Sequence, residues 1–347
     1  MLTSELDYNL PREFIAQHPS EKRDESRLLV LDRGTGAISH GRFRDITKHL
    51  VEGDVLVLNN TRVLPAKLIG RRRTGGKVDT LLVREVRTGL WETMLISTRR
   101  LTDGEPLTFE DGAIGAIFRG RAESGLPLIE FDDPEHLHEK LNECGRAPLP
   151  PYIKRSAFAD DFRSEDIDRY QTVYAATPGA IAAPTAGLHF TRELLDELEA
   201  GGVTLEMLTL HVGPGTFKPI KTETVEEHPL EPEFYEVPAG LPERILEAKA
   251  QGRRIVSVGT TACRTLETLA RMEPGQWQLK GATGLFIYPP FEFKWVDALQ
   301  TNFHLPRSSL LALVFAFAGR ERILAAYEEA KQRGCRFYSY GDATLIV

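Results

Sequence analysis

Residues 255–264 have the sequence IVSVGTTACR and decide the fold, because an apolar run passes through one glycine and two threonines into a helical pattern. The run at 255–258 predicts a buried strand, and residues 262–272 predict a helix. Free backbone N–H groups at such a helix start bind anions, and the hydroxyls of Thr260 and Thr261 add donors. Arg264 places a cation against the helix dipole, which favours a bound carboxylate or phosphate. Ordinary helix capping is the alternative interpretation.

Strand and helix patterns alternate along the chain after about residue 165. Thr191 is a predicted N-cap for a helix that closes at Gly201, and Pro242 is predicted at the first position of another helix. Further helices are predicted at residues 309–318 and 321–333, and strands at 54–58, 208–212, 336–340 and 344–347. Such alternation predicts an α/β domain with a largely parallel or mixed sheet.

The pattern changes between residues 67 and 132. Short segments at 80–86, 91–97 and 114–118 are rich in β-branched residues or aromatics, with glycine-containing turns between them. This spacing predicts a small antiparallel barrel or sandwich. We therefore expect a larger α/β domain with a mixed sheet, formed by residues 1–62 and 148–347, and a smaller inserted all-β, barrel-like domain formed by residues 63–147.

The composition of the 347 residues is that of a globular protein, with 41% hydrophobic and 27% charged residues. Three distant cysteines without a C-x-x-C pair favour a reducing cytoplasm and disfavour disulfides, zinc and iron–sulfur clusters. His136 and His138 lie in an acidic, surface-like stretch, so we expect no metal. The longest apolar run, at residues 310–318, is far shorter than a membrane span, so we expect no membrane contact.

The charge distribution distinguishes the middle of the chain from the rest. The net charge of −7 disfavours a protein that coats nucleic acid through bulk charge. Residues 62–131, however, carry 12 Lys and Arg against 9 Asp and Glu, a balance of +3, which leaves −10 for the remainder. This stretch is the better candidate for contact with phosphate, and an ordinary solvated surface is the alternative.

Three further stretches carry polar residues that could take part in catalysis or ligand binding. Residues 183–190, APTAGLHF, place His189 beside small residues that let a ligand approach the backbone. Residues 210–217, LHVGPGTF, fail the dinucleotide fingerprint because the sixth position is Lys218, so we interpret them as a ligand-lining turn. Residues 301–309, TNFHLPRSS, gather Asn302 and His304 before an apolar helix, where capping by a serine is the alternative.

Together with LNNTRV at 58–63, PLPPYI at 148–153, YQTVY at 170–174 and the turn YSYGDA at 338–343, these stretches resemble one family. It is the S-adenosylmethionine:tRNA ribosyltransferase-isomerases of queuosine synthesis. The resemblance runs from Asp7 to the C-terminus, and the number and order of its motifs make it specific. It implies a larger α/β domain and a smaller β-barrel-like domain.

The resemblance implies a reaction that uses the ribosyl group of S-adenosylmethionine and not its methyl group. The acceptor is 7-aminomethyl-7-deazaguanine in the wobble position of tRNA, and the products are epoxyqueuosine-tRNA, adenine and methionine. S-adenosylmethionine is then a cosubstrate, and no permanently bound cofactor is expected. We expect a monomer.

The resemblance and residue type together assign candidate roles. His189, His211 and His304 are acid/base candidates, in no firm order. Thr260, Thr261 and Arg264 are candidates for the methionine carboxylate, and Asn59, Asn60 and Arg62 for adenine or the ribose hydroxyls. Thr185 and Asn302 complete the expected substrate contacts. RNA contact is expected on a basic set in the middle stretch, comprising Arg71, Arg72, Arg73, Arg99 and Arg100.

Two positions depart from the family pattern. Pro214 replaces the alanine of H-V-G-A-G-T-F, and Glu231 occupies the second histidine of H-x-M-H-x-E. A catalytic role at that second position is therefore in doubt, whereas His228 and Glu233 remain candidates.

Two other functions compete with this interpretation. A methyltransferase that uses S-adenosylmethionine should carry a glycine-rich loop after an early strand, and residues 59–62, NNTR, do not form one. A non-catalytic RNA-binding protein with a β-barrel would leave the polar clusters of the α/β domain unexplained.

Overall fold

The computed structural model describes residues 1–97, 99–155, 162–213, 215 and 218–347. The chain divides into two compact units. The first comprises residues 1–62, 171–177 and 183–347, and the second comprises residues 63–170 and 178–182. Each unit has its own hydrophobic core.

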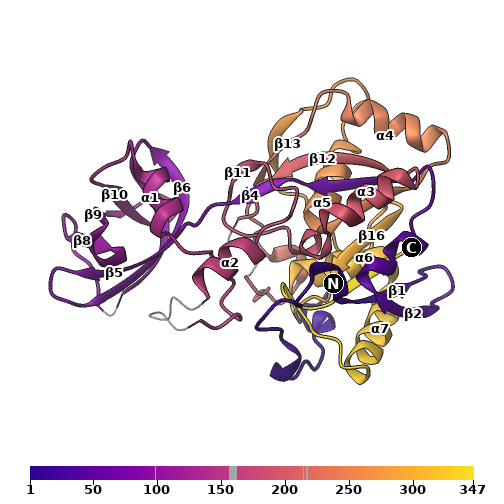
Figure 1. Cartoon of the computed structure of the whole chain (residues 1–347), viewed down its shortest axis with the longest axis horizontal. Coiled ribbons are helices and arrows are strands. Elements are labelled where there is room, and N and C mark those ends of the chain that lie inside the picture. Colours follow the sequence, from indigo (N-terminus) through magenta and orange to yellow (C-terminus); the bar gives the residue numbers. More distant parts are fainter. Residues whose placement is uncertain (98, 156–161, 214, 216–217) are drawn as a thin grey trace. The chain divides into compact units, whose positions relative to one another are not determined.

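The first unit is built on a nine-stranded mixed sheet (Figure 1) with the order β15-β13-β12-β3-β14-β16-β17-β1-β2. Its strands are β1 (Arg27–Leu31), β2 (Ile38–Arg42), β3 (Val55–Asn59), β12 (Thr204–Leu210), β13 (Glu233–Glu236), β14 (Ile255–Val258), β15 (Lys280–Thr283), β16 (Ala298–Asn302) and β17 (Ala343–Ile346). The central strands β12, β3, β14 and β16 run parallel to one another, so their carboxyl ends share one edge.

Helices cover both faces of this sheet. They are α3 (Arg192–Ala200), α4 (Leu241–Ala250), α5 (Gly259–Leu269), α6 (Ser309–Ala318), α7 (Arg320–Gln332) and the 3-10 helices η4 (Phe43–Lys48) and η6 (Thr185–His189). Alternation along β3 sends Leu56 and Leu58 into a core that includes the leucines of α3 and Phe43 of η4. Asn59 points to the other face, where it contacts Thr261 of α5.

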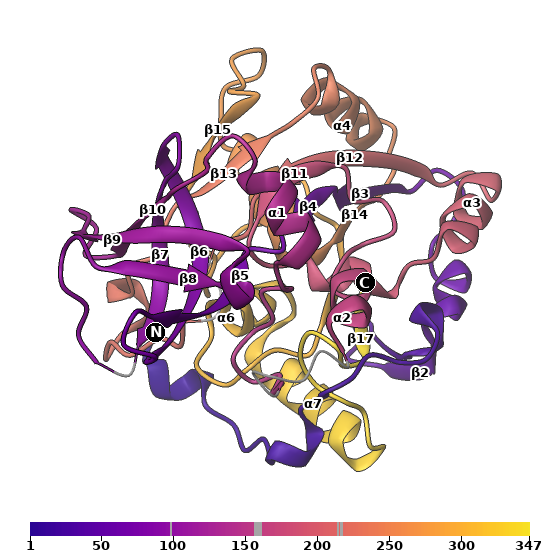
Figure 2. The same ribbon diagram turned by 60° about the vertical axis from the view of Figure 1, so that its left-hand side comes forward.

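The second unit is a closed antiparallel barrel, whose six strands appear from the side in Figure 2, with the order β10-β7-β6-β5-β8-β9. Its elements are β5 (Lys67–Arg72), β6 (Lys77–Arg87), β7 (Leu90–Ser97), β8 (Pro106–Phe109), β9 (Ile114–Arg121), β10 (Pro127–Phe131), α1 (Leu137–Cys144) and α2 (Arg163–Arg169). Gly70 permits closure, because a Cβ there would lie 2.4 Å from both the Phe109 ring and the Thr108 carbonyl. Closure leaves no strand edge unpaired. Two short strands, β4 (Thr61–Val63) and β11 (Thr177–Ala180), pair where the chain passes between the units.

The predicted fold class is confirmed: a larger α/β unit with a mixed sheet accompanies a smaller all-β barrel. Two predicted helix starts are also confirmed, since Thr191 caps α3 and Ser308 caps α6 through their hydroxyls. The strand predicted at residues 336–340 is wrong. Asp342 accepts a hydrogen bond from the Arg336 N–H and Tyr338 has a φ of 75°, so this aromatic stretch turns instead of extending.

A buried carboxylate fixes the approach to β16. Glu267 of α5 is fully buried and accepts hydrogen bonds from the backbone N–H groups of Lys294, Trp295 and Val296, at 2.9 to 3.1 Å. Arg271 supplies its counter-charge at 2.7 Å. The loop that enters β16 is therefore held by one side chain of a neighbouring helix.

Replacing Glu267 by alanine should lower the free energy of unfolding by about 3 to 5 kcal/mol, because three backbone N–H groups, two of them buried, lose their acceptor and Arg271 loses its counter-charge. Urea unfolding followed by circular dichroism measures this loss. Glu328→Ala is the matched control, since that carboxylate is 59% exposed and pairs only with Lys331 on the same helix. Equal stability of the two variants would contradict the role assigned to Glu267.

Candidate functional site

The polar residues singled out in the α/β unit gather at the carboxyl ends of the parallel strands. Asn59 ends β3, Asn302 ends β16, and His211 directly follows β12. Thr260 and Thr261 stand just beyond β14, in the first turn of α5. In open α/β sheets this edge is where ligands bind.

Asn59 joins three elements at this edge. Its Nδ2 donates to the Leu210 carbonyl at 2.9 Å and to Thr261 Oγ1 at 3.2 Å. Its Oδ1 accepts from the N–H groups of Leu210 and Thr61, at 3.0 and 3.1 Å. A carboxamide offers two donors and two acceptor positions, so Asn59 has no hydrogen-bonding capacity left for a ligand. It positions β12, β3 and α5 relative to one another.

His189 is the centre of a buried network. Asn302 Nδ2 donates to its Nε2 at 3.0 Å, so the ring proton is on Nδ1, 2.7 Å from Ser26 Oγ. The ring also stacks on Phe43, with centroids 5.0 Å apart. Thr185 Oγ1 donates to Asn302 Oδ1 at 3.2 Å, which ties η6 to the end of β16. Both ring nitrogens of His189 are therefore engaged by the protein.

Burial also fixes the charge of His189 and His304. Burial lowers the pKa of His189 to about 3, and Arg336 and Arg23 contribute in the same direction. Burial alone lowers the pKa of His304 to about 3. Its Nε2 lies 3.0 Å from Thr301 Oγ1, and its backbone N–H donates to the Tyr327 hydroxyl. Both imidazoles are neutral at pH 7.

His211 has a different environment. It is half-buried, its Nδ1 lies 2.8 Å from Thr61 Oγ1, and its ring stacks on Phe234 with an interplanar angle of 14°. Burial lowers its pKa from the ordinary value. No hydrogen bond from the described part of the chain reaches its Nε2.

The start of α5 lies against η6. A Cβ at Gly259, whose φ is 85°, would be 3.3 Å from the Ala186 Cβ, so glycine permits this close approach. Arg264 contacts an anion, and that anion belongs to the protein: it forms a buried ion pair with Glu233. Glu233 also accepts from the Gly213 N–H at 3.0 Å. Thr260 and Thr261 of this turn are each 7% exposed.

The other predicted substrate residues differ in exposure. Asn60 is half-buried, and its Oδ1 accepts a hydrogen bond from Thr209 Oγ1 at 2.7 Å. Arg62 is exposed. Of the two departures from the family pattern, Glu231 is exposed and pairs with Lys218 at 2.6 Å. Pro214 lies outside the described residues.

The basic residues predicted to contact RNA all lie in the barrel unit. Arg72 forms a bidentate pair with Glu105, at 2.6 and 2.9 Å. Arg71, Arg73, Arg99 and Arg100 are exposed. The five therefore do not share one environment.

Sequence reasoning missed Ser26 and Thr61 as members of the site, and it kept Glu233 as a candidate without predicting its partner. Ser26, Thr61 and Glu233 contact His189, His211 and Arg264 respectively. Thr61 was visible in the motif at 58–63, and Glu233 followed a family motif. Nothing local distinguishes Ser26, which reaches the site only because β1 lies in the same sheet.

The described residues contain neither a metal-binding cluster nor a helix that could span a membrane. No group of three or more His, Cys, Asp or Glu side chains there is arranged to hold a metal ion. None of the helices seen in these residues combines the length and the apolar character that crossing a membrane requires.

Comparison with known proteins identifies relatives over the full length. Residues 3–346 match the family described as queuosine biosynthesis protein. Proteins named S-adenosylmethionine:tRNA ribosyltransferase-isomerase from Carboxydothermus hydrogenoformans and Pelobacter propionicus are 50% and 49% identical, with 100% of each chain covered. The crystal structure of S-adenosylmethionine tRNA ribosyltransferase from Thermotoga maritima is similar at a TM-score of 0.55 and 39% identity, covering 99% of this chain and 100% of that one.

The family match covers nearly the whole chain, and the relatives at 49% to 50% identity cover all of it. Both units therefore lie within the matched region. The chain therefore belongs to the queuosine biosynthesis protein family.

Proposed function

We propose that this protein is an S-adenosylmethionine:tRNA ribosyltransferase-isomerase of the cytoplasm, active as a monomer. The observation that carries the proposal is that enzymes of that name are 49% to 50% identical to this chain over its full length. The convergence of the predicted motifs on one sheet edge supports it, because ligands bind at such edges. Its three cysteines are free thiols, in keeping with a reducing compartment.

The proposed acceptor is the aminomethyl group of 7-aminomethyl-7-deazaguanine at the tRNA wobble position. The sulfonium of S-adenosylmethionine acidifies the C5′ protons of its ribose, and a base removes one of them. The ribose then rearranges with loss of adenine, the tRNA amine attacks C1′, and epoxide closure expels methionine. The chemistry needs a base, an acid near adenine and donors for the methionine carboxylate.

His211 is the acid/base residue that we favour. Its Nε2 receives no hydrogen bond from the described part of the chain, its pKa is lowered so that the neutral form is present at pH 7, and Thr61 orients its ring. His189 and His304 are held in buried contacts and act as positioning residues that fix η6 and the end of β16.

The substrate contacts are proposed from motif membership and from position at or beside this sheet edge. Thr260, Thr261 and the backbone N–H groups of the first turn of α5 are proposed to bind the methionine carboxylate. Arg264, neutralised by Glu233, shapes this turn and the one at Gly213. Asn60 and Arg62 are proposed to meet the ribose or adenine, and Thr185 and Asn302 to line the site beside η6.

A reaction of the wild-type protein with S-adenosylmethionine and tRNA carrying the deazaguanine should release adenine and methionine. Mass spectrometry of the digested tRNA should show the epoxide-containing cyclopentyl adduct. Formation of S-adenosylhomocysteine instead would show a methyltransferase. An unchanged tRNA with neither product would leave only RNA binding, and either result overturns the proposal.

His211→Asn should lower kcat for adenine release by about 100-fold or more, because asparagine keeps a polar contact to Thr61 but cannot carry a proton. Because burial lowers the pKa of His211, the wild-type rate should fall only at a pH below the ordinary histidine value of about 6.5, and this acid limb should disappear in the variant. His136→Asn, in an exposed pair with Asp133, should behave as wild type. A normal rate for His211→Asn would exclude this residue as the base.

The free energy of unfolding should fall as pH decreases from about 6.5 towards 3. Unfolded histidines bind protons near 6.5, whereas folded His189 and His304 stay neutral until pH is about 3, so acid stabilises the unfolded chain. Each contributes a slope of up to about 1.4 kcal/mol per pH unit. Urea titrations across this window should show a shallower slope for His304→Gln. An identical slope would mean that His304 is protonated in the folded protein.

A further inference from the structure

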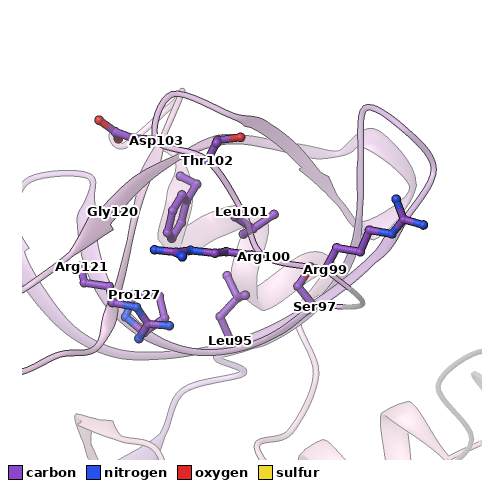
Figure 3. Close-up of a pocket in the computed structure, with 11 residues that line it drawn as sticks. Leu95, Ser97, Arg99, Arg100, Leu101, Thr102, Asp103, Gly120, Arg121 and Pro127 are labelled. Carbon is purple, nitrogen blue, oxygen red and sulfur yellow. The ribbon is translucent and has the colours of Figure 1, made fainter.

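The barrel unit contains a hollow that the proposed reaction does not use. Its volume is about 1110 Å³. It lies between the segment that follows β7 and the hairpin of β9 and β10 (Figure 3). The residues around it are Leu95, Ser97, Arg99, Arg100, Leu101, Thr102, Asp103, Phe118, Gly120, Arg121 and Pro127.

The hollow concentrates arginines that lack carboxylate partners. No hydrogen bond or ion pair joins Arg99 or Arg100 to another described residue, and Arg121 donates only to the Gly125 carbonyl. Elsewhere in the unit the common arrangement is an ion pair, as for Arg72, Arg84, Arg87, Arg119, Arg146 and Arg155. Uncompensated cations in one concavity indicate a binding site for an anion.

The directions of the side chains sharpen this picture. In Figure 3 Arg100 and Arg121 extend into the same hollow, whereas Arg99 points away from it. Asp103, the one acidic residue of the lining, carries its carboxylate at the rim and away from Arg100. Two guanidinium groups thus converge on the interior, and a third is displayed beside it.

The lining also has an apolar part. Leu95, Leu101, Phe118 and Pro127 contribute side chains, and Leu101 and Phe118 are each only 8% exposed, so they anchor the wall in the barrel core. A small inorganic anion needs cations but no apolar wall. A nucleotide needs both, because its phosphate pairs with arginine while its base packs on apolar side chains or a guanidinium plane.

Hydrogen bonds to Glu105 and the burial of Leu101 hold the residues that directly follow Arg99 and Arg100. Glu105 accepts hydrogen bonds from the Thr102 N–H and hydroxyl, at 3.1 and 3.2 Å, and pairs with Arg72 of β5. Burial of Leu101 holds the same segment from the other side. The arginines are therefore presented by a fixed loop, which lowers the entropy cost of binding.

We propose that this hollow binds one unstacked nucleotide of an RNA, with its phosphate between Arg100 and Arg121 and its base against Leu101 and the edge of Phe118. Arg99 meets the next phosphate outside the hollow. The identification of that RNA as the tRNA acceptor rests on the proposed function. In the proposed reaction the wobble base is modified at the α/β unit. The nucleotide bound in the hollow is therefore a different nucleotide of the same RNA.

The test compares the full-length wild type with Arg100→Ala, Arg121→Ala and the double variant. Binding of a tRNA transcript is measured by fluorescence anisotropy at several salt concentrations. The double variant should raise the Kd on the order of 10-fold. The slope of log K against log salt should shrink by about 0.7, because Arg100 and Arg121 share one phosphate and each neutralised single-stranded phosphate accounts for about 0.7. Arg100→Lys should recover the slope but only part of the affinity, since lysine lacks the planar surface.

Arg87→Ala is the matched control. It removes one positive charge from the same barrel, but Glu130 keeps Arg119 as its partner. Its RNA affinity and salt slope should equal those of the wild type. A loss as large as that of Arg100→Ala would show that bulk charge binds the RNA, and wild-type binding by the double variant would place the RNA elsewhere; both results overturn the proposal.

Competition and turnover separate the remaining alternatives. Uridine 5′-monophosphate should displace the RNA, but only at a far higher concentration than unlabelled RNA requires. If inorganic phosphate displaces the RNA at the same concentration as the mononucleotide, the hollow is only a phosphate site. In turnover, the double variant should raise KM for tRNA and leave kcat and the KM for S-adenosylmethionine unchanged. Absence of adenine release by the wild type would defeat the proposed function, whereas the binding measurements would still decide the role of the hollow.

Discussion

The carboxamide of Asn59 is the constraint on which the α/β unit depends. It lies at the end of β3, and its four hydrogen bonds join β3 to β12, to the chain just beyond β3 and to the first turn of α5. β3 is an inner strand of the parallel group. These bonds therefore fix where the neighbouring strands end along the sheet edge. His211 and Thr261 take their positions from that alignment.

Around this frame the protein keeps its polar groups neutral or paired. His189 and His304 are uncharged because burial disfavours the imidazolium form, and Arg264 meets the carboxylate of Glu233. A cationic substrate such as a sulfonium therefore meets no unpaired positive charge from these three side chains. His211, whose Nε2 receives no hydrogen bond from the described part of the chain, is the residue that we propose exchanges a proton in this neutral environment.

The sequence was most informative where local patterns and tertiary packing agree. The hydroxyl caps of α3 and α6, the alternation of strands and helices and the glycine-punctuated barrel segments all followed from spacing. Prediction failed at residues 336–340, where the polar contact of Asp342 with the Arg336 N–H outweighs the β-propensity of the aromatics. The site was only partly visible, because Ser26 and Glu233 reach it through long-range pairing. Arg264 shows the same limit. The sequence predicted that it contacts an anion, but only the fold shows that this anion is Glu233.

The strand order also constrains how the polypeptide is assembled during translation. β1 pairs with β17, and β17 in turn pairs with β16, so residues near the two ends of the sequence become neighbours within one sheet. β1 can pair with β2 as soon as both have left the ribosome, but its other edge must wait for β17, one of the last strands to be synthesised. The barrel draws its strands from one contiguous segment and is free of that delay. Nascent chains of this protein can therefore complete the barrel while one edge of β1 is still unpaired, and this open edge is where chaperones have most to protect.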